Sequence, residues 1–295
     1  MTYRQPSLTD VIRTLQVEQT GDDHFVATQL DNPNHHIVGG HIAGQALMAA
    51  SRTTPGRTPH SVHVYCLRAG DASRPVELQV ERARDGGTLS TRHVTARQDG
   101  DVLLEALASF SKLVDDGEYQ ESRPDVPEPE SLRPLQEQLA PYADELRGFW
   151  VRPQPFELRY VDPPPRLAIE TPTPSPRLRI WWRPTEPVPD DDVLHSCLLT
   201  YFSGTTMLEA ALTKRRATPV STFNALIDHA LWFHRPKSTC RTGCCRISSR
   251  PAESAAGDWR PRRSTTGRAS WCASPLRSST SVVRSPASAQ RVEAC

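Results

Sequence analysis

The residues best suited to acid–base chemistry stand side by side in one segment. Asp228 and His229 are adjacent in ALIDHALWFHRP, and a carboxylate or an imidazole can transfer a proton in a reaction. The composition of this segment predicts a strand, and adjacent strand residues point to opposite faces. A joint role is therefore disfavoured. His60 and His63 of HSVHVYCLR also fall on opposite sides of a predicted strand, and a structural role is the commoner outcome for such residues.

A second group of candidate side chains offers hydroxyls. Ser203, Thr205 and Thr206 surround Gly204 in TYFSGTTMLEAAL. These hydroxyls could orient a water molecule weakly, and Thr205 or Thr206 could instead cap a helix that carries Met207. No Ser–His–Asp or Cys–His spacing favours a covalent nucleophile. We therefore predict that any reaction at this segment proceeds without a covalent enzyme intermediate.

The cysteines indicate neither a metal centre nor a disulfide framework. Five of the seven lie after residue 237, namely Cys240, Cys244, Cys245, Cys272 and Cys295. A zinc site would need a second ligand pair at short spacing, and TCRTGCC has none. No export signal, which would make disulfides favourable, is recognisable in MTYRQPSLTDVIRTLQV. We predict no metal and no cofactor.

The elements that must position these residues form two units. Residues 1–115 predict the first unit, in which HIAGQALMAASR is a helix with apolar residues at helical spacing. Four strand-like stretches follow, and turn signals at 85–87 and 99–100 separate the last three. The small residues of the helix allow a sheet to approach it closely. This order predicts an antiparallel sheet wrapped around one buried helix.

A linker and a second unit come next. Residues 116–149 are rich in acidic residues and proline, which predicts a solvated linker with little to bury, although QEQLAPYADELRGFW could form a short helix. Residues 150–237 predict a second, truncated unit with strands in FELRYVDPPP, RLRIWWRP and ALIDHALWFHRP and a helix in DVLHSCLLTYFSG. A helix followed by a strand with a histidine repeats the first unit weakly, which indicates internal duplication.

Residues 238–295 show no hydrophobic periodicity of a helix or a strand. They contain ten arginines and twelve serines but only three acidic side chains and two tryptophans. A disordered basic arm fits this composition, and an RNA-binding tail would want more aromatics. An out-of-frame translation of a GC-rich gene fits better. After residue 237 the shifted frame can read DLSDWLL, and with the same offset residues 263–281 can read LYNRAGELVCVATQELYF, which is a strand, a turn and a strand.

The bulk composition excludes several classes of protein. The 295 residues carry a net charge of +1, so no global field favours nucleic acid. No stretch approaches the roughly 20 apolar residues that span a bilayer. We expect a cytoplasmic protein with no membrane span and no nucleic-acid partner.

Several motifs resemble the type II acyl-CoA thioesterase family. IVGGHIAGQALMAA, HSVHVYCLRAGD and VERARDGGTLSTRHVTARQDG resemble the N-terminal half of that family, whereas DDDVLHSCLLTYFSG and IDHALWFHRP resemble its C-terminal half. The resemblance covers most of residues 8–237. It implies an α+β fold of two hot-dog domains in tandem, each with an antiparallel sheet around a central helix. It also implies acyl-CoA as substrate and hydrolysis to a free fatty acid and CoA.

The resemblance also locates the site. In that family a carboxylate, a hydroxyl residue and a glutamine activate the water that attacks the thioester. The carboxylate position corresponds to Gly204, the hydroxyl position corresponds to Leu226, and the glutamine survives only in the shifted frame. The weak candidates that remain for catalysis are Thr205 and Asp228. The resemblance implies substrate contacts at Gly39, Gly40, Gln45 and His229.

These departures leave two functions open. One is a thioesterase that has lost at least the roughly 100-fold contribution of a positioned acid–base group. The other is an inactive hot-dog protein that binds acyl-CoA or a protein partner without hydrolysis. We expect a homo-oligomer in either case, because the fold leaves open sheet faces and edges. Loss of the last strands would expose a sheet edge, which predicts poor stability.

Overall fold

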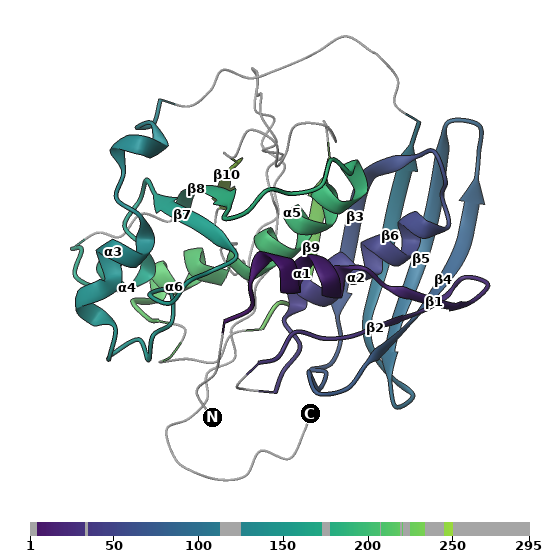
Figure 1. The fold of residues 1–295 in the computed structure, drawn as a ribbon, viewed down its shortest axis with the longest axis horizontal. Helices are drawn as coiled ribbons and strands as arrows, with labels where there is room; N and C mark the ends of the chain where they lie inside the picture. Colours follow the sequence, from purple (N-terminus) through teal and green to yellow (C-terminus); the bar gives the residue numbers. More distant parts are fainter. Residues whose placement is uncertain are drawn as a thin grey trace, which may run out of the picture.

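The computed structural model describes residues 5–32, 35–112, 125–172, 178–206, 208–218, 220, 225–233 and 245–249. Its ribbon shows a large sheet and a smaller sheet with two long helices between them (Figure 1). The helices are α1 (Leu8–Leu15), α2 (Gly39–Arg52), α3 (Leu135–Leu139), α4 (Pro165–Ala168), α5 (Asp192–Thr206) and α6 (Leu208–Arg215). Two short 3-10 helices are η1 (Pro129–Ser131) and η2 (Ala140–Tyr142).

The large sheet has seven strands in the order β1-β2-β4-β5-β6-β3-β9, and all of its neighbouring strands pair antiparallel. These strands are β1 (Glu18–Gly21), β2 (His24–Ala27), β3 (Thr58–Cys66), β4 (Val76–Asp85), β5 (Leu89–Gln98), β6 (Asp101–Ser111) and β9 (Asp228–Trp232). The turn between β5 and β6 has φ of 50° at Asp99 and 86° at Gly100. Positive φ at both central residues is what the predicted hairpin requires.

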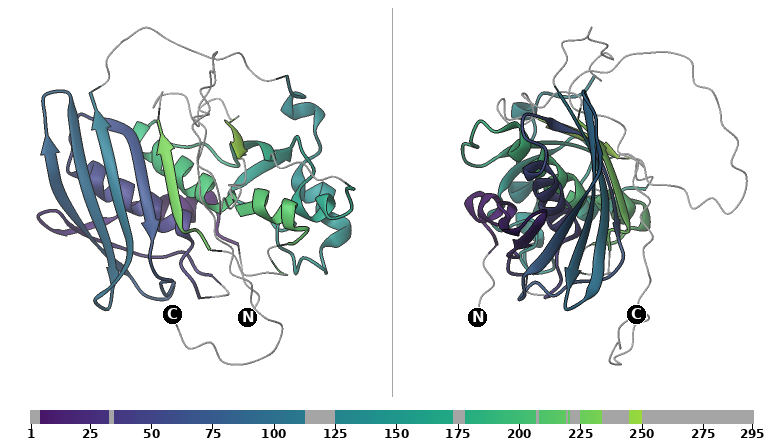
Figure 2. Two further views of the ribbon diagram at one scale, coloured as in Figure 1. Left: turned by 180° about the vertical axis from the view of Figure 1, so that it is seen from behind. Right: turned by 90° about the vertical axis from the view of Figure 1, so that its right-hand side faces the viewer.

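Helix α2 is the centre of the N-terminal half. Eleven consecutive residues, from Gly40 to Ala50, are buried, and the side view shows the helices on one face of the seven-stranded sheet (Figure 2). A helix without a polar stripe needs cover on every side, and sheet, α1 and α5 supply it. The predicted helix wrapped by an antiparallel sheet is confirmed.

Helix α1 was not among the predicted elements, although the sequence contains its start signal. The Ser7 hydroxyl accepts from the backbone N–H of Asp10, and the Asp10 carboxylate accepts from the N–H of Ser7. This capping box satisfies two backbone donors that the first turn leaves free. It fixes α1 where its buried residues Val11 and Leu15 pack in the core.

The linker prediction is wrong for its second half. Leu135, Leu139 and Leu146 are completely buried, and Trp150 is 4% exposed. Their helical spacing gives α3 and the following turns one apolar side, and burying that side stabilises the segment more than solvation would. Residues 113–124, the acidic first part, lie outside the described residues.

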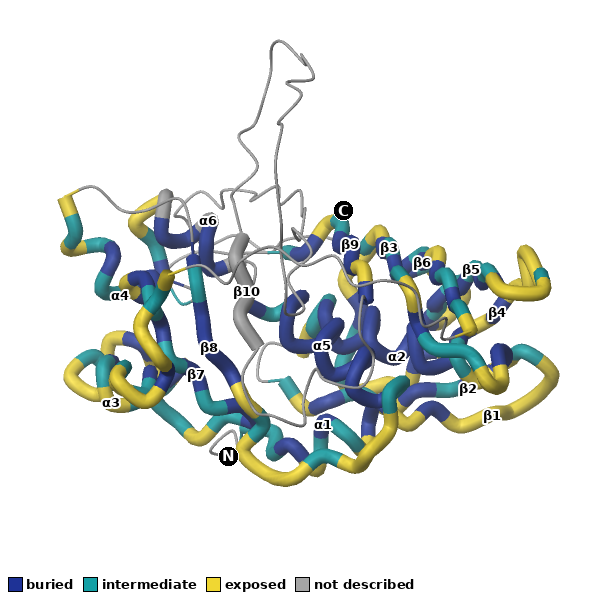
Figure 3. Tube along the Cα trace, turned by 90° about the horizontal axis from the view of Figure 1, so that it is seen from above, coloured by how far each residue is buried: buried dark blue, intermediate teal, exposed yellow. Residues whose placement is uncertain are grey.

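The C-terminal half contains a sheet of three strands in the order β10-β8-β7, with bounds β7 (Phe156–Tyr160), β8 (Leu178–Pro184) and β10 (Cys245–Ser249). Strands β7 and β8 confirm two predicted strands. Their inward side chains pack on α5, where the Phe202 ring stacks on Trp182 with ring centroids 4.2 Å apart. Figure 3 shows α5 beside α2 as a second buried helix.

The two halves join in one sheet. Strand β9, from the C-terminal half, pairs antiparallel with β3, and His63 lies opposite Ala230 in the register. The view from behind shows β9 at the edge of the large sheet, beside β3 (Figure 2). Helices α2 and α5 pack directly against each other beneath this pair. We call the β3–β9 pair and the α2–α5 contact the seam.

Strand β10 lies within the predicted tail, after residue 237. Cys245–Ser249 pairs with Leu178–Trp182 of β8 in an antiparallel register. An unpaired edge of β8 would leave backbone donors and acceptors exposed, and any extended segment can satisfy them. The remaining tail residues, 234–244 and 250–295, lie outside the described residues.

Candidate active site

The seam brings two glycines into backbone contact. A Cβ added at Gly204 would lie 2.6 Å from the Cα of Gly40, and a Cβ added at Gly40 would lie 2.4 Å from the carbonyl oxygen of Tyr201. Both distances are far shorter than a van der Waals contact between these atoms. Helices α2 and α5 therefore cross here at a separation that only glycine allows.

Leu226 lies beside this crossing. Its Cδ2 is 3.5 Å from the position of a Cβ at Gly204, and its own Cβ is 2.9 Å from the position of a Cβ at Gly39. The positions that the sequence assigned to the carboxylate and hydroxyl residues are thus neighbours, next to the start of α2. Gly204 contributes no side chain and Leu226 contributes only hydrocarbon, so neither position supplies an acceptor for a water molecule.

The start of α2 is the polar feature of this region. No side chain caps it: its N-cap residue is Val38, whose side chain makes no cap hydrogen bond. The first backbone N–H groups of a helix lack partners within the helix and carry partial positive charge. Gly39 and Gly40 therefore present donors of the kind that stabilise a developing oxyanion.

The two weak catalytic candidates are not brought together. The Thr205 hydroxyl donates to the carbonyl of Tyr201, one turn back, in place of capping a new helix. The alternative cap at Thr206 is wrong as well, because α5 continues through Thr206, whose hydroxyl donates to Phe202. Asp228 points away from the helices, with its Oδ2 3.9 Å from Nε2 of His63.

His229 points to the inner face, opposite to Asp228, as strand alternation predicts. Its Nε2 lies 3.0 Å from the Ser203 hydroxyl, and the residue is completely buried. Burial lowers the pKa of His229 to about 4, with a smaller contribution from His63. The ring is neutral at pH 7 and ties β9 to α5 beside the glycine crossing. The ring is buried in this structure, and its role as a substrate contact stays a prediction.

Gln45 is also completely buried, and its amide is saturated by structural bonds. Its Nε2 donates to the carbonyls of Thr14 and Thr28, each at 2.8 Å, and its Oε1 accepts from Gln29 at 3.0 Å. These bonds fasten α1 and the segment after β2 to α2. Of the four predicted substrate contacts, Gly39 and Gly40 lie at the start of α2, whereas Gln45 and His229 are completely buried.

Glu209 was not among the predicted site residues, although it is a buried carboxylate in the structure. Glu209 is 5% exposed and accepts hydrogen bonds from Trp150 and Tyr160. Its only sequence signal is a charged residue inside the otherwise apolar stretch MLEAAL. It lies in the C-terminal half, on the helix that follows α5.

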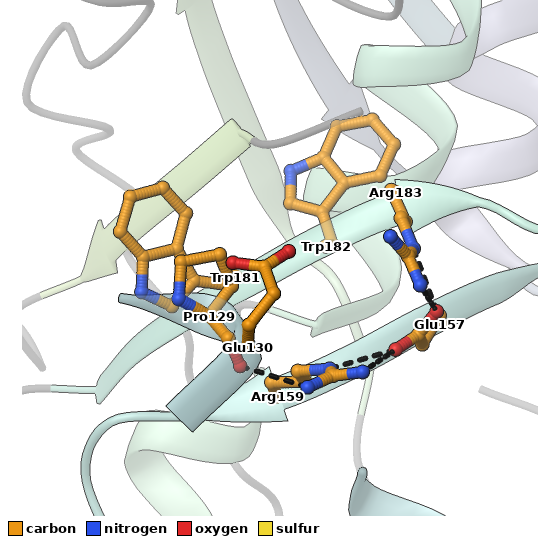
Figure 4. Close-up of a pocket in the computed structure, with 7 residues that line it drawn as sticks. All are labelled: Pro129, Glu130, Glu157, Arg159, Trp181, Trp182 and Arg183. Atoms are coloured by element: carbon orange, nitrogen blue, oxygen red, sulfur yellow. Dashed lines mark hydrogen bonds and ion pairs between the residues drawn. The ribbon is translucent and has the colours of Figure 1, made fainter. Parts of the chain in front are cut away.

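The side chains that line the pocket in Figure 4 mainly hold the linker in place. It is lined by Pro129, Glu130, Glu157, Arg159, Trp181, Trp182 and Arg183. Arg159 donates to Glu157 and to the carbonyls of Pro129 and Leu132. Arg183 donates to the same glutamate. The charges of Arg159, Arg183 and Glu157 are paired within this cluster. The bond from Arg159 to the Pro129 carbonyl holds η1 against the outer face of β7 and β8.

Two further classes of site are absent from the described part of the chain. No group of three or more histidine, cysteine, aspartate or glutamate side chains is placed to hold a metal ion there. Within the same residues, no helix has both the length and the apolarity to cross a membrane.

Known proteins are similar to this chain in sequence and in fold. Residues 28–111 match the family model described as acyl-CoA thioesterase N-terminal domain, and residues 172–257 match the model described as acyl-CoA thioesterase. Acyl-coenzyme A thioesterase 8 of Rattus norvegicus is 32% identical over 77% of this chain and 74% of its own. Acyl-CoA thioesterase 2 of Haemophilus influenzae is 30% identical over 78% and 82%.

A solved structure extends this likeness to three dimensions. The tesB protein of Mycobacterium avium subsp. paratuberculosis superposes with a TM-score of 0.67 and 38% identity, covering 85% of this chain and 89% of that one. The predicted tandem hot-dog architecture is confirmed by this match together with the paired halves. The chain belongs to the type II acyl-CoA thioesterase family.

Proposed function

We propose that this protein acts on fatty acyl-CoA and hydrolyses the thioester slowly, releasing a free fatty acid and CoA. The observation that carries the proposal is the convergence at the seam. The uncapped start of α2 meets positions 204 and 226 there, in a chain related to acyl-CoA thioesterases over most of its length.

The start of α2 has a clear task in this reaction. A thioester carbonyl placed at Gly39 and Gly40 would receive backbone N–H donors and the positive end of a 14-residue helix. These donors strengthen as negative charge develops on the oxygen, so they lower the barrier to attack by water. Leu226 beside them gives the acyl carbon an apolar neighbour.

Water activation is the weak part of this site. With glycine at 204 and leucine at 226, the hydroxyls of Ser203 and Thr205 are the polar groups adjacent in sequence to the lost carboxylate. A hydroxyl is a poor general base, so we expect turnover at least about 100-fold below that of a thioesterase with a positioned carboxylate.

A second function, binding of acyl-CoA without hydrolysis, is favoured by the packing at Gly204. The contact with Gly40 leaves no room for a side chain, so the absence of the carboxylate is built into the helix crossing. A protein selected only to bind would tolerate this arrangement, whereas a fast hydrolase would not.

One paired experiment separates these functions. Binding of long-chain acyl-CoA is measured by calorimetry, and release of CoA is followed chromatographically on the same preparation. Binding with slow turnover supports hydrolysis, and binding without product supports the second function. Absence of binding at millimolar acyl-CoA would contradict both.

Self-association and a cytoplasmic location complete the proposal. The outer face of the large sheet supports self-association, because Tyr65, Leu107 and Trp232 are between 42% and 53% exposed on adjacent strands. Sedimentation of the purified chain tests self-association. Fractionation of cells that express the chain tests the cytoplasmic location. A monomer at all concentrations would refute self-association.

The proposal includes an out-of-frame tail. In the N-terminal half β4 pairs with β2, and β10, which belongs to the tail itself, occupies the corresponding edge of β8. Counterparts of β5 and β6 are missing among the described residues. The shifted frame over residues 263–281 offers a strand, a turn and a strand, which are the two elements that this duplication leaves open.

A further inference from the structure

Glu209 is the centre of a buried cluster that joins three segments. Trp150, at the end of the linker, donates from Nε1 to Oε1 of Glu209 at 2.9 Å. The Tyr160 hydroxyl of β7 donates to the other carboxylate oxygen. Glu209 itself lies in the first turn of α6. One carboxylate therefore holds the linker, the sheet and the helix together.

The described arginines around Glu209 are paired with other groups. Arg166 of α4, which packs on α6, is paired with Glu145 and Glu170. Within the described part of the chain, Glu209 forms no ion pair with any arginine, lysine or histidine.

The other elements packed on α6 direct their charges elsewhere. Glu157 and Arg159 of β7 pair with each other on the opposite face of the strand from Tyr160. Asp192 and His195 belong to the far end of α5. Burial therefore dominates and raises the pKa of Glu209 to about 7, against which the bonds from Tyr160 and Trp150 act.

The backbone next to Trp150 is strained. Trp150 has a φ of 64° and Arg147 a φ of 51°, both in the left-handed region that side chains with a Cβ disfavour. The Trp150 ring is buried, and its bond to Glu209 fixes it there. Freeing Trp150 from Glu209 would therefore also relieve the turn at 147–150.

We propose that Glu209, Tyr160 and Trp150 form a pH-sensitive latch that holds the end of the linker on the C-terminal half in acid and loosens it near neutrality. Protonated Glu209 is a neutral buried group with two hydrogen-bond partners. Deprotonation places a charge in an apolar interior, and opening returns that charge to water. The latch lies outside the seam and is independent of acyl-CoA hydrolysis.

The direction of the pH effect follows from linkage. The pKa of Glu209 is raised from 4.5 to about 7 in the closed state. The closed state is therefore fully favoured below about pH 4.5, and it loses this advantage as pH rises toward 7. Each pH unit within that window changes the opening equilibrium about tenfold.

Limited proteolysis of the full chain tests the latch. Trypsin cleavage at the exposed Arg147–Gly148 bond is timed by mass spectrometry in the wild type and in Glu209→Gln at each pH. Taking the ratio at one pH removes the pH dependence of the protease. We expect the ratio of wild-type to variant cleavage to rise roughly tenfold from pH 6 to pH 8. The matched control is Glu137→Gln, a carboxylate on α3 whose side chain is 61% exposed.

Tyr160→Phe keeps the test informative if Glu209→Gln folds poorly. It removes one donor to the carboxylate, so the pKa of Glu209 should rise further and the ratio should level off at a higher pH. A ratio that stays constant between pH 6 and pH 8 overturns the proposal. An equal effect of Glu137→Gln overturns it as well.

Discussion

The two halves of the molecule repeat one plan but complete it to different degrees. Helix α2 faces β1 to β6 of its own half, whereas α5 faces β7, β8 and the five-residue β10. Among the described residues the C-terminal half thus has three of the strands that the N-terminal half uses, plus β9 in the other sheet. The comparison teaches that the core of the second half depends on chain beyond residue 237.

The halves also differ in what they place at their shared seam. The N-terminal half contributes an uncapped helix start at Gly39 and Gly40, which is a polar feature. The C-terminal half contributes Gly204 and Leu226, which have no polar side-chain atom. Under the proposed function, the N-terminal half supplies the groups that bind the thioester, whereas Gly204 and Leu226 of the C-terminal half cannot activate water.

Replacing the proposed out-of-frame tail should have the largest effect. A chain in which residues 238–295 are replaced by the shifted-frame translation should gain the two missing strands. Each buried large apolar side chain contributes about 1.5–3 kcal/mol before entropy is subtracted, so we expect a net gain of roughly 5 kcal/mol or more. Chemical denaturation of both chains measures it.

A matched chain with the tail removed after Pro236 serves as the control. If it is as stable as the frame-restored chain, the shifted frame adds no strands and the out-of-frame interpretation fails. If the original chain elutes as a monomer or dimer without aggregates and melts in a sharp transition, this would also count against the out-of-frame interpretation.

Local structure was predictable from the sequence where a pattern was complete within a few residues. The helix of α2, the strands β7, β8 and β9, and the hairpin at Asp99–Gly100 all follow from periodicity or turn residues. The burial of Leu135 and Leu139 was missed because proline and acidic residues nearby suggested solvation. Their partners come from the C-terminal half, which local composition does not reveal.

The site was predictable in position but not in packing. Resemblance placed Gly204 and Leu226 together, and they are neighbours in the structure. The contact between Gly204 and Gly40 depends on how two distant helices cross, and no periodicity within either helix encodes that. The hydrogen bonds of Gln45 were missed for a related reason, since its partners Thr14 and Thr28 come from other segments.

Gly204→Ala should measure how tightly the halves are joined. Replacing glycine within a helix normally stabilises by up to about 1 kcal/mol. Here the new Cβ would meet the Cα of Gly40 at 2.6 Å, and overpacking against backbone costs about 1–3 kcal/mol. We expect net destabilisation of about 2 kcal/mol by urea denaturation.

The matched control is Gly87→Ala, in the turn between β4 and β5, where an added Cβ meets nothing within 4 Å. It should change the free energy of unfolding by less than about 0.5 kcal/mol. Equal effects of the two substitutions would mean that the helix crossing is looser than the geometry of Gly204 indicates.

His229 predicts a pH dependence that belongs to the seam. Burial lowers the pKa of His229 from 6.5 to about 4, so the unfolded chain binds the proton more readily. Its contribution to stability is complete above pH 6.5 and is lost as pH falls toward 4. Between pH 7 and pH 5 the wild type should lose about 2 kcal/mol more than His229→Asn.

Glu209 acts in the opposite direction, because its pKa is raised to about 7 and its contribution is lost as pH rises. Because both proteins contain Glu209, its contribution cancels when the free energy of unfolding of His229→Asn is subtracted from that of the wild type. The measurement is denaturant unfolding at pH 5, 6 and 7. Parallel pH profiles of the two proteins would show that the buried ring does not titrate with folding.

The smallest effect is expected at Asp228, on the outer face of the seam. Its contact with His63 is 3.9 Å long and the imidazole is 44% exposed, so Asp228→Asn should change the free energy of unfolding by less than about 1 kcal/mol. The Cys66 thiol should respond more clearly. Burial and the nearby Asp228 charge raise its pKa to about 11, and removing the charge should lower that pKa. The rate of Cys66 alkylation at pH 9 measures the change, with the buried Cys197 of α5 as the unresponsive control. If Cys66 reacts at the same rate in both proteins, the Asp228 charge does not affect the thiol on the inner side of the seam. The two faces of β9 are then electrostatically separate.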